Sequence, residues 1–122
     1  MTTETKTQTC ANDKYAQFTG TDHYYTYMMG SLLTDGAMQM ATDEKCFWLM
    51  DIVASYSMEI KLKSEEFQVW ILTRVKDDEF KVTCDDGNGN ILIVQKIPFS
   101  DFPFDTVKLF KVQNVIMLPC EY

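Results

Sequence analysis

In the second half of the chain, apolar residues are arranged as in β-strands, and in "FKVTC" and "VKLFKV" they alternate with polar residues at a period of two. Runs of β-branched and aromatic residues predict strands at 67–75, 80–84, 91–97 and 107–112, followed by a short one in the stretch "VIMLP". Polar or proline-containing stretches of a few residues separate them. The pattern predicts an antiparallel sheet of four to five strands.

In the first half, apolar residues recur instead at the spacings of three and four that are typical of an amphipathic helix. The longest such run is predicted to form the main helix, at about 44–60, and its apolar face is formed by Leu49, Ile52, Val53, Tyr56 and Ile60. Thr34 or Asp35 is the predicted N-cap of a preceding helix, and 23–29 predicts a short strand or an irregular packed segment. The expected fold is therefore α+β, with N-terminal helices packed on the C-terminal antiparallel sheet.

The length of 122 residues is typical of one domain, and the polar, threonine-rich start predicts a flexible tail over 1–12 followed by a single domain over 13–122. No apolar run approaches the ~20 residues of a membrane helix, and the N-terminus lacks the apolar stretch of a secretory signal. These features predict a cytoplasmic protein that does not enter membranes. Apolar and aromatic residues at 24–33 suit either the core or the face of a homodimer, and both alternatives remain open.

The chain is acidic, with 18 Asp and Glu residues, 11 Lys and Arg residues and a formal net charge of −7. Such a charge repels nucleic acid and favours a cationic partner, such as a basic protein or ribonucleoprotein surface. Two acidic clusters are expected at opposite ends of the 80–84 strand, and they are the candidate partner-binding residues: Asp77, Asp78, Glu79, Asp85 and Asp86. Charged turns are also typical of any soluble hairpin, so this structural interpretation stays beside the functional one.

The stretch "CDDGNGNI" at 84–91 raises the question of calcium binding, because Asp86, Asn88 and Gly89 fit three positions of an EF-hand loop. The first ligand position is then Cys84 and the twelfth is Gln95, so two strong ligands are missing. The flanks are predicted strands rather than helices, and glycine and asparagine favour tight hairpin turns. A hairpin turn is the preferred interpretation, and no metal site is assigned.

The sequence gives few indications of catalytic residues. His23 is the one histidine, and the four cysteines, Cys10, Cys46, Cys84 and Cys120, are too far apart for a C-x-x-C motif. Several aspartates are available for acid–base or magnesium chemistry, but sequence alone selects no pair: Asp35, Asp51, Asp85, Asp86, Asp101 and Asp105. A small carboxylate- or Cys/His-dependent enzyme acting on nucleic acid or nucleotides remains the alternative, with no catalytic residue and no cofactor assigned.

Several stretches occur together in one order: "FTGT" at Phe18, "LLTDG" at Leu32, "CDDGNGN" at Cys84, "IPFSDFP" at Ile97 and the terminal "LPCEY". Over residues 15–122 the chain resembles a family of small bacterial proteins known only as a domain of unknown function, found on plasmids and phage-like elements. The resemblance brings no catalytic residues. It implies a non-enzymatic interaction protein of a mobile element that binds and inhibits a host nucleic-acid-targeting defence complex, such as an RNA-guided CRISPR nuclease.

Overall fold

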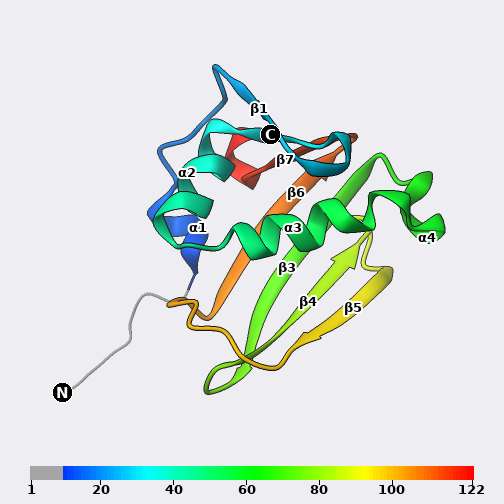
Figure 1. The fold of residues 1–122 in the computed structure, drawn as a ribbon. Helices are drawn as coiled ribbons and strands as arrows, with labels where there is room; N and C mark the ends of the chain where they lie inside the picture. Colours follow the sequence, from blue (N-terminus) through cyan, green and yellow to red (C-terminus); the bar gives the residue numbers. More distant parts are fainter. Residues whose placement is uncertain (1–9) are drawn as a thin grey trace.

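A seven-stranded mixed sheet organises residues 10–122, the part of the chain that this computed structural model describes (Figure 1). Its strands follow the order β1-β2-β7-β6-β3-β4-β5. Their bounds are β1 (Tyr24–Thr26), β2 (Leu32–Thr34), β3 (Phe67–Lys76), β4 (Glu79–Asp85), β5 (Ile91–Ile97), β6 (Thr106–Val112) and β7 (Val115–Met117). β2 and β7 run parallel, and the other neighbouring pairs are antiparallel.

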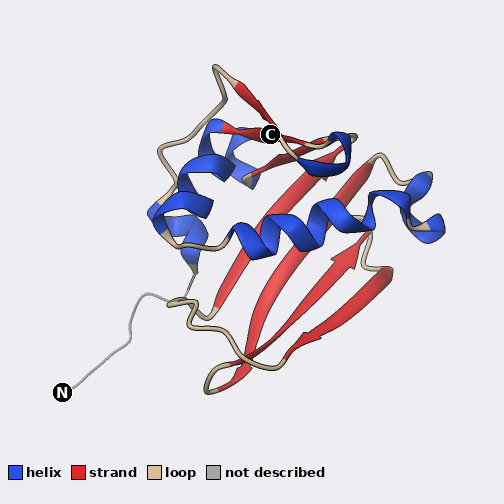
Figure 2. Ribbon diagram, in the orientation of Figure 1, coloured by secondary structure: helices blue, strands red, loops and turns tan. Residues whose placement is uncertain are grey.

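Short helices accompany this sheet, and α3 crosses one of its faces (Figure 2). The α-helices of the described residues are α1 (Ala11–Lys14), α2 (Asp35–Asp43), α3 (Phe47–Ser55) and α4 (Ile60–Lys63). Single turns of 3-10 helix lie at η2 (Met28–Gly30), η3 (Tyr56–Met58) and η4 (Pro119–Glu121). Buried residues of α2 and α3 form one core cluster with the inward-facing residues of the sheet.

The predicted arrangement of N-terminal helices on a separate C-terminal antiparallel sheet of four to five strands is wrong. The five C-terminal strands are present, but β1 and β2 from the N-terminal half extend the same sheet to seven strands. The pairing of β2 with β7 makes the sheet mixed, since Leu32 lies beside Val115 and Leu33 beside Ile116 in parallel register. Strands of three residues are too short to show a period of two, so their pairing depends on partners far away in the sequence.

The predicted main helix over about 44–60 is also wrong in its extent. Lys45 has a φ of 54°, which separates α2 from α3, and the helix then begins at Phe47. After Ser55 the chain tightens into the 3-10 turn η3, and Glu59 is extended with a ψ of 128°. As a result Leu49 and Val53 are buried, whereas Ile60, assigned to the same apolar face, is 83 % exposed.

The predicted tail over 1–12 falls mostly on residues 1–9, which lie outside the described residues. Within its last part, the side chain of Ala11 is buried and Cys10 bridges Thr106 in parallel orientation. Asn12 bonds to β6, as described below. Packed structure therefore includes residues 10–12 as well as the predicted domain over 13–122.

Alternation along the central strands separates a buried face of the sheet from an open one. The inward side chains of three strands are buried: Trp70, Leu72, Phe80, Val82, Cys84, Val107 and Leu109. The side chains between them point to the opposite face, which α2 and α3 do not cover. The same alternation also places two polar residues, Gln68 and Lys111, on the buried face, where they lie opposite one another in the β3–β6 register.

The start of α2 is joined to the end of the chain. Thr34 caps the helix, as predicted, because its Oγ1 accepts a hydrogen bond from the Ala37 amide. The carboxylate of Glu121 accepts from the Gly36 amide at 2.9 Å, from Thr34 Oγ1 at 2.6 Å and from the Leu118 amide at 2.9 Å. A carboxylate at a helix N-terminus is favourable because it meets free N–H groups and the positive end of the helix dipole. The stretches "LLTDG" and "LPCEY" thus meet in one junction.

Candidate functional site

One end of the sheet carries exposed carboxylates on a two-residue turn. Lys76 and Glu79 pair across the β3–β4 hairpin, and Asp77 and Asp78 form its turn. Asp77 has a φ of 47°, a left-handed conformation that aspartate tolerates better than most residues. The side-chain carboxylates of Asp77, Asp78 and Glu79 accept no hydrogen bond from residues 10–122, so they remain available to a partner.

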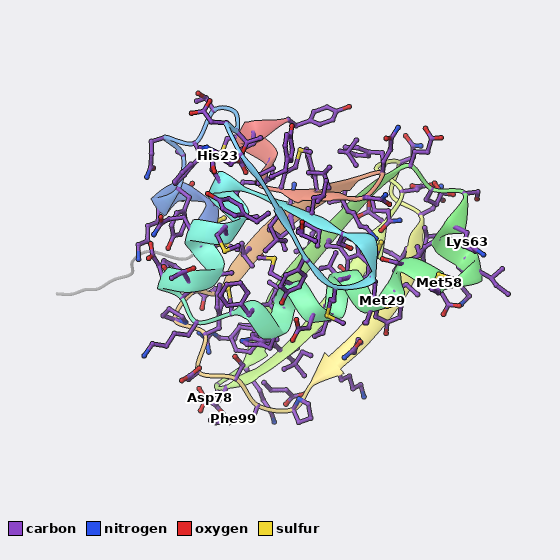
Figure 3. The ribbon with its side chains drawn as sticks, turned by 45° about the horizontal axis from the view of Figure 1, so that its top comes forward. His23, Met29, Met58, Lys63, Asp78 and Phe99 are labelled. Carbon is purple, nitrogen blue, oxygen red and sulfur yellow. The ribbon has the colours of Figure 1, made fainter. Side chains whose placement is uncertain are left out.

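The loop between β5 and β6 packs against this turn and adds two more aspartates. The Ser100 amide donates to the Asp78 carbonyl at 2.9 Å, which brings Asp101 to the same corner. Asp78 and Phe99 lie side by side there in Figure 3. We name this surface the acidic end and define it as Asp77, Asp78, Glu79, Asp101 and Asp105.

The Arg74 side chain links the two segments that form the acidic end, the β3–β4 turn and the β5–β6 loop. Its guanidinium donates to Asp105 Oδ1 at 2.9 Å, to the Phe102 carbonyl at 3.0 Å and to the Phe104 carbonyl at 3.1 Å. It also donates to the Asp77 carbonyl and lies 4.6 Å from the centre of the Phe80 ring. One cation therefore fixes both the hairpin turn and the neighbouring loop, which gives the carboxylates of the acidic end a defined arrangement.

The two other candidate residues, Asp85 and Asp86, lie at the opposite end of β4, as the sequence predicts. Asp85 Oδ1 accepts from the Gly87 amide at 2.7 Å, and Asp86 Oδ1 accepts from the Asn88 amide at 2.8 Å. Asp86 Oδ2 also accepts from the side-chain amide of Asn90 at 2.8 Å. Both carboxylates are thus engaged in shaping their own loop, unlike those of the acidic end.

This loop is the predicted hairpin turn between β4 and β5. Gly87 and Gly89 have φ values of 88° and 90°, which glycine adopts without steric cost. Strands flank it on both sides, whereas an EF-hand loop lies between helices. Within residues 10–122, no three His, Cys, Asp or Glu side chains come together in a group suited to a metal ion.

Hydrogen bonding from the Asn90 side chain, and then from the Asn88 amide, lowers the pKa of Asp86 below its ordinary 3.8. A folded-state pKa below the unfolded value contributes stability above the unfolded pKa, and this contribution is lost as the pH falls through the folded pKa. We expect Asp86→Asn to be less stable than wild type at neutral pH, and the difference to shrink below about pH 4. Urea unfolding of both proteins across this range is the measurement. Asp78→Asn, an exposed carboxylate without such bonds, is the control and is expected to show no such convergence.

The face of the sheet turned away from α2 and α3 carries lysines in an otherwise acidic protein. Across the strands, Thr73 lies between Thr106 and Lys81, and Lys81 lies beside Lys96. The next row along the sheet contains Lys108, Ile71, Thr83 and Val94 in the same register. These two rows contain three lysines and no carboxylate. We name them the open face.

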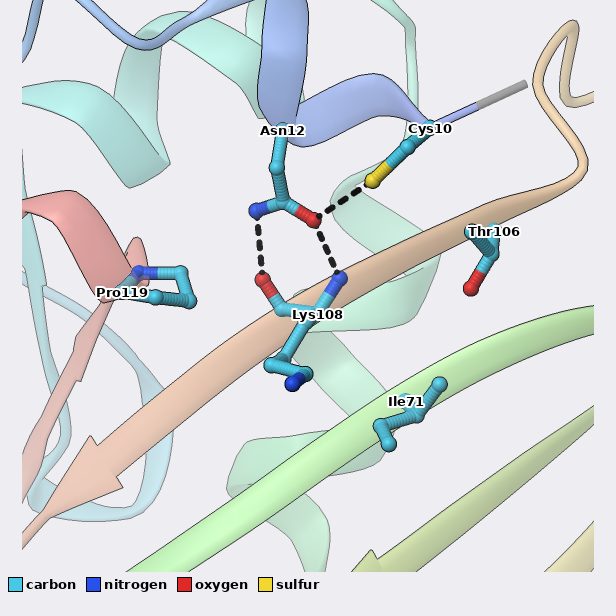
Figure 4. Close-up of a pocket in the computed structure, with 6 residues that line it drawn as sticks. All are labelled: Cys10, Asn12, Ile71, Thr106, Lys108 and Pro119. Carbon is cyan, nitrogen blue, oxygen red and sulfur yellow. Dashed lines mark hydrogen bonds between the residues drawn. The ribbon is translucent and has the colours of Figure 1, made fainter.

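A hollow of ≈ 290 Å³ lies at the edge of the open face and is lined by Cys10, Asn12, Ile71, Thr106, Lys108 and Pro119 (Figure 4). The Asn12 side chain donates to the Lys108 carbonyl at 2.9 Å and accepts from the Lys108 amide at 2.8 Å. Cys10 Sγ in turn donates to Asn12 Oδ1 at 3.3 Å. Asn12 thus provides hydrogen-bond partners for the backbone N–H and C=O of Lys108, a part of β6 that does not pair with β7. This part of the edge of β6 is therefore closed to pairing with another strand.

Of the groups considered for catalysis, two of the cysteines are buried, whereas His23 lies on the surface beside Asp35. The thiols of Cys46 and Cys84 are buried, and burial raises the pKa of each to about 12, so both stay protonated at neutral pH. His23 is 73 % exposed and its Nδ1 lies 3.6 Å from Asp35 Oδ1. The Asp35 carboxylate also accepts from the Asp22 amide at 2.9 Å, which gives it a structural role in that loop. No assignment of a catalytic residue follows from these positions.

Residues 24–33, for which the sequence leaves open a place in the core or on a dimer face, are partly buried and partly exposed. Leu33 is fully buried, whereas Tyr24, Met28 and Met29 are about half exposed at 58 %, 43 % and 50 %. In Figure 3, Met29 lies on the 3-10 turn η2, which follows β1. A homodimer through this segment stays a prediction. Among residues 10–122, no helix has the length and apolar character needed to cross a bilayer.

Sequence reasoning missed two residues that matter most to the surfaces described here. Arg74 offers no local signal, because three of the four acceptors of its guanidinium come from a loop about thirty residues away. Lys111 does offer one: in "VKLFKV", Val107, Leu109 and Lys111 share one parity, so alternation places the lysine inward. Its environment is described in the last section of these Results.

Comparison with known proteins assigns this chain to a family but identifies no individual relative. No curated protein and no solved structure matches it. A family model does match, over residues 9–122, which includes every surface described above. The predicted membership in a family of unknown function is confirmed, while its bacterial, mobile-element setting stays a prediction. The chain belongs to the family of unknown function DUF6876.

Proposed function

We propose that this protein is a non-enzymatic interaction protein that binds a basic surface of another protein or ribonucleoprotein through its acidic end. The proposal includes an origin of the protein in a phage or mobile element. The partner is then a host nucleic-acid-targeting defence complex, such as an RNA-guided nuclease. Binding of this protein inhibits the activity of that complex.

The observation that carries the proposal is the arrangement of the acidic end. The side-chain carboxylates of Asp77, Asp78 and Glu79 accept no hydrogen bond from residues 10–122, and Arg74 fixes the backbone of the turn that carries them. Carboxylates held in place on a rigid turn meet a basic surface without a large cost in side-chain and loop ordering. They also attract a cationic partner over a distance of about one Debye length.

Asp85 and Asp86 are left out of the proposed contact, although the sequence groups them with the other acids. Their carboxylates already accept hydrogen bonds from the β4–β5 loop, so a partner would compete with these bonds. The open face, with Lys81, Lys96 and Lys108, lies on the sheet surface rather than at its end. Because negative and positive charges lie on different parts of the surface, the protein approaches a basic partner with its acidic end turned toward it.

The test is affinity capture from a lysate of the host cell, with nuclease treatment to remove nucleic acid, followed by binding kinetics with the captured partner. We expect the triple variant Asp77→Lys, Asp78→Lys, Glu79→Lys to lose capture and to slow association at least about tenfold at low salt. The association rate of wild type is expected to fall as salt rises.

The matched control reverses three other exposed acids, Asp13, Asp22 and Glu66, and so changes the net charge by the same amount. It is expected to keep most of the binding. Equal loss in both triple variants would show that net charge, not the acidic end, is recognised. Absence of any stoichiometric partner, or capture that survives reversal of the acidic end, would contradict the proposal.

A further inference from the structure

One buried lysine forms no ion pair with a carboxylate of residues 10–122. Lys111 of β6 is 4 % exposed and lies on the inward face of the sheet, between Gln68 of β3 and Ile116 of β7. Its ammonium carries three donors, yet its one hydrogen bond to residues 10–122 goes to Ser57 Oγ at 2.9 Å. None of the ion pairs of residues 10–122 includes it.

The neighbours of Lys111 do not offset its charge. Gln68 is the nearest polar residue across the strands, but its Oε1 accepts from Trp70 Nε1 at 2.9 Å. Its Nε2 donates to the Glu65 carbonyl at 3.1 Å. Loss of hydration on burial lowers the pKa of Lys111 below its ordinary value. An ammonium in this position is costly to bury, because no carboxylate of residues 10–122 lies within ion-pair distance of it.

A small polar cavity opens beside this ammonium. It measures ≈ 160 Å³ and is lined by Lys111 with Ser57, Leu62, Lys63, Glu65, Glu66, Gln68, Gln113 and Asn114. That volume is below the range of about 300–1,000 Å³ found for drug-sized ligands, so it suits a group of a few heavy atoms. Besides the ammonium, the lining offers a hydroxyl and side-chain amides, which donate hydrogen bonds to oxygen atoms.

We propose that Lys111, together with Ser57, Gln113 and Asn114, forms a binding site for a small oxyanion of the phosphate or carboxylate type. The anion supplies the counter-charge that the protein withholds from the buried ammonium, and the neutral donors surround its oxygen atoms. Glu65 and Glu66 line the same cavity, half-buried and exposed respectively, and their negative charge opposes an anion more strongly the higher its charge is. The site is distinct from the acidic end, so it does not depend on the proposed function.

The experiment follows the melting temperature of the full chain while phosphate or acetate is added, with chloride at equal ionic strength as the reference. We expect at least one of the two anions to raise the melting temperature in a saturable way. A shift with phosphate alone assigns the phosphate type, a shift with acetate alone assigns the carboxylate type, and both together assign a general oxyanion site. A response no larger than that of chloride overturns the proposal.

Two variants connect the response to this lysine. Lys111→Met keeps an unbranched side chain, one heavy atom shorter, and removes its charge, so it is expected to abolish the anion response. Without added anion it is expected to melt at or above the temperature of wild type, because an uncompensated buried charge is removed. The control is Lys108→Met, on the same strand but on the open face, which should keep the full response.

A purely structural role for Lys111, as a tether to Ser57, predicts a different pattern. Lys111→Met and Ser57→Ala then lower the melting temperature alike, and wild type shows no specific anion response. Amide chemical shifts of wild type give an answer that does not depend on any variant folding. Changes on adding the anion are expected at Ser57, Gln113 and Asn114, and changes confined to Lys81 and Lys96 on the open face would refute the site.

Discussion

Replacing Gly36 by alanine is expected to destabilise the protein by about 2 kcal/mol, although alanine is the better helix former. A Cβ at this position would lie 2.7 Å from Glu121 Oε1 and 2.9 Å from Leu118 Cδ1. The Glu121 carboxylate cannot simply swing away, because it accepts hydrogen bonds from Thr34, Gly36 and Leu118. Hydrogen bonds to a charged group contribute about 1.5–3 kcal/mol each, so losing part of this set exceeds the gain in helix propensity.

Urea unfolding measures the change, and Gly20→Ala is the matched control. A Cβ on Gly20 meets no atom within 4 Å, so this variant is expected to stay within about 0.5 kcal/mol of wild type. The effects of Gly36→Ala and Glu121→Ala should not add, because each disrupts the same junction. Strict additivity, or a Gly36→Ala variant as stable as wild type, would show that the C-terminus does not hold the start of α2.

Replacing Arg74 by alanine is expected to cost about 3 kcal/mol and to loosen the loop that contributes Asp101 and Asp105 to the acidic end. The ion pair with Asp105 accounts for little of this cost, since that carboxylate is 56 % exposed and surface pairs contribute about 0–1 kcal/mol. The larger part comes from the carbonyls of Phe102 and Phe104, which lose their donor, and from the contact with the Phe80 ring.

Two measurements separate these effects. Urea unfolding gives the loss of global stability, and amide hydrogen exchange over residues 98–105 reports on the loop. Arg74→Lys keeps the charge but cannot reproduce the planar fork of donors, so it is expected to recover only part of the stability. Full recovery in the lysine variant would show that charge alone matters. Unchanged exchange in Arg74→Ala would show that other contacts hold the loop.

The sequence predicts best where the signal is local. β4 and β6 show a period of two, and β3 and β5 are runs rich in β-branched and aromatic residues, so the existence and approximate bounds of these strands can be predicted from side-chain type alone. The β4–β5 turn follows in the same way, because Gly87 and Gly89 suit the left-handed conformation that the hairpin requires. The Thr34 cap is equally local, since the hydroxyl and the Ala37 amide that it accepts from are three residues apart.

For the candidate surfaces, too, the sequence predicts the local features and not those that depend on distant residues. The presence of acids at both ends of β4 follows from the order of residues, but their different uses do not. Asp85 and Asp86 accept bonds within their own loop, whereas Asp77 and Asp78 are left free while Arg74 and Ser100 hold their backbone. Which carboxylates are available to a partner therefore depends on which donors the fold brings near them.

By itself, the sequence of this protein determined its strand-forming segments, its glycine turn, its acidity and the inward parity of Lys111. Only the tertiary structure decided that β2 pairs in parallel with β7, that the helix predicted over 44–60 is interrupted, and that Glu121 closes the start of α2. The physical reason is the range of the interactions. Alternation and turn preference act between near neighbours, whereas strand pairing and carboxylate bonding at this junction join residues more than eighty positions apart.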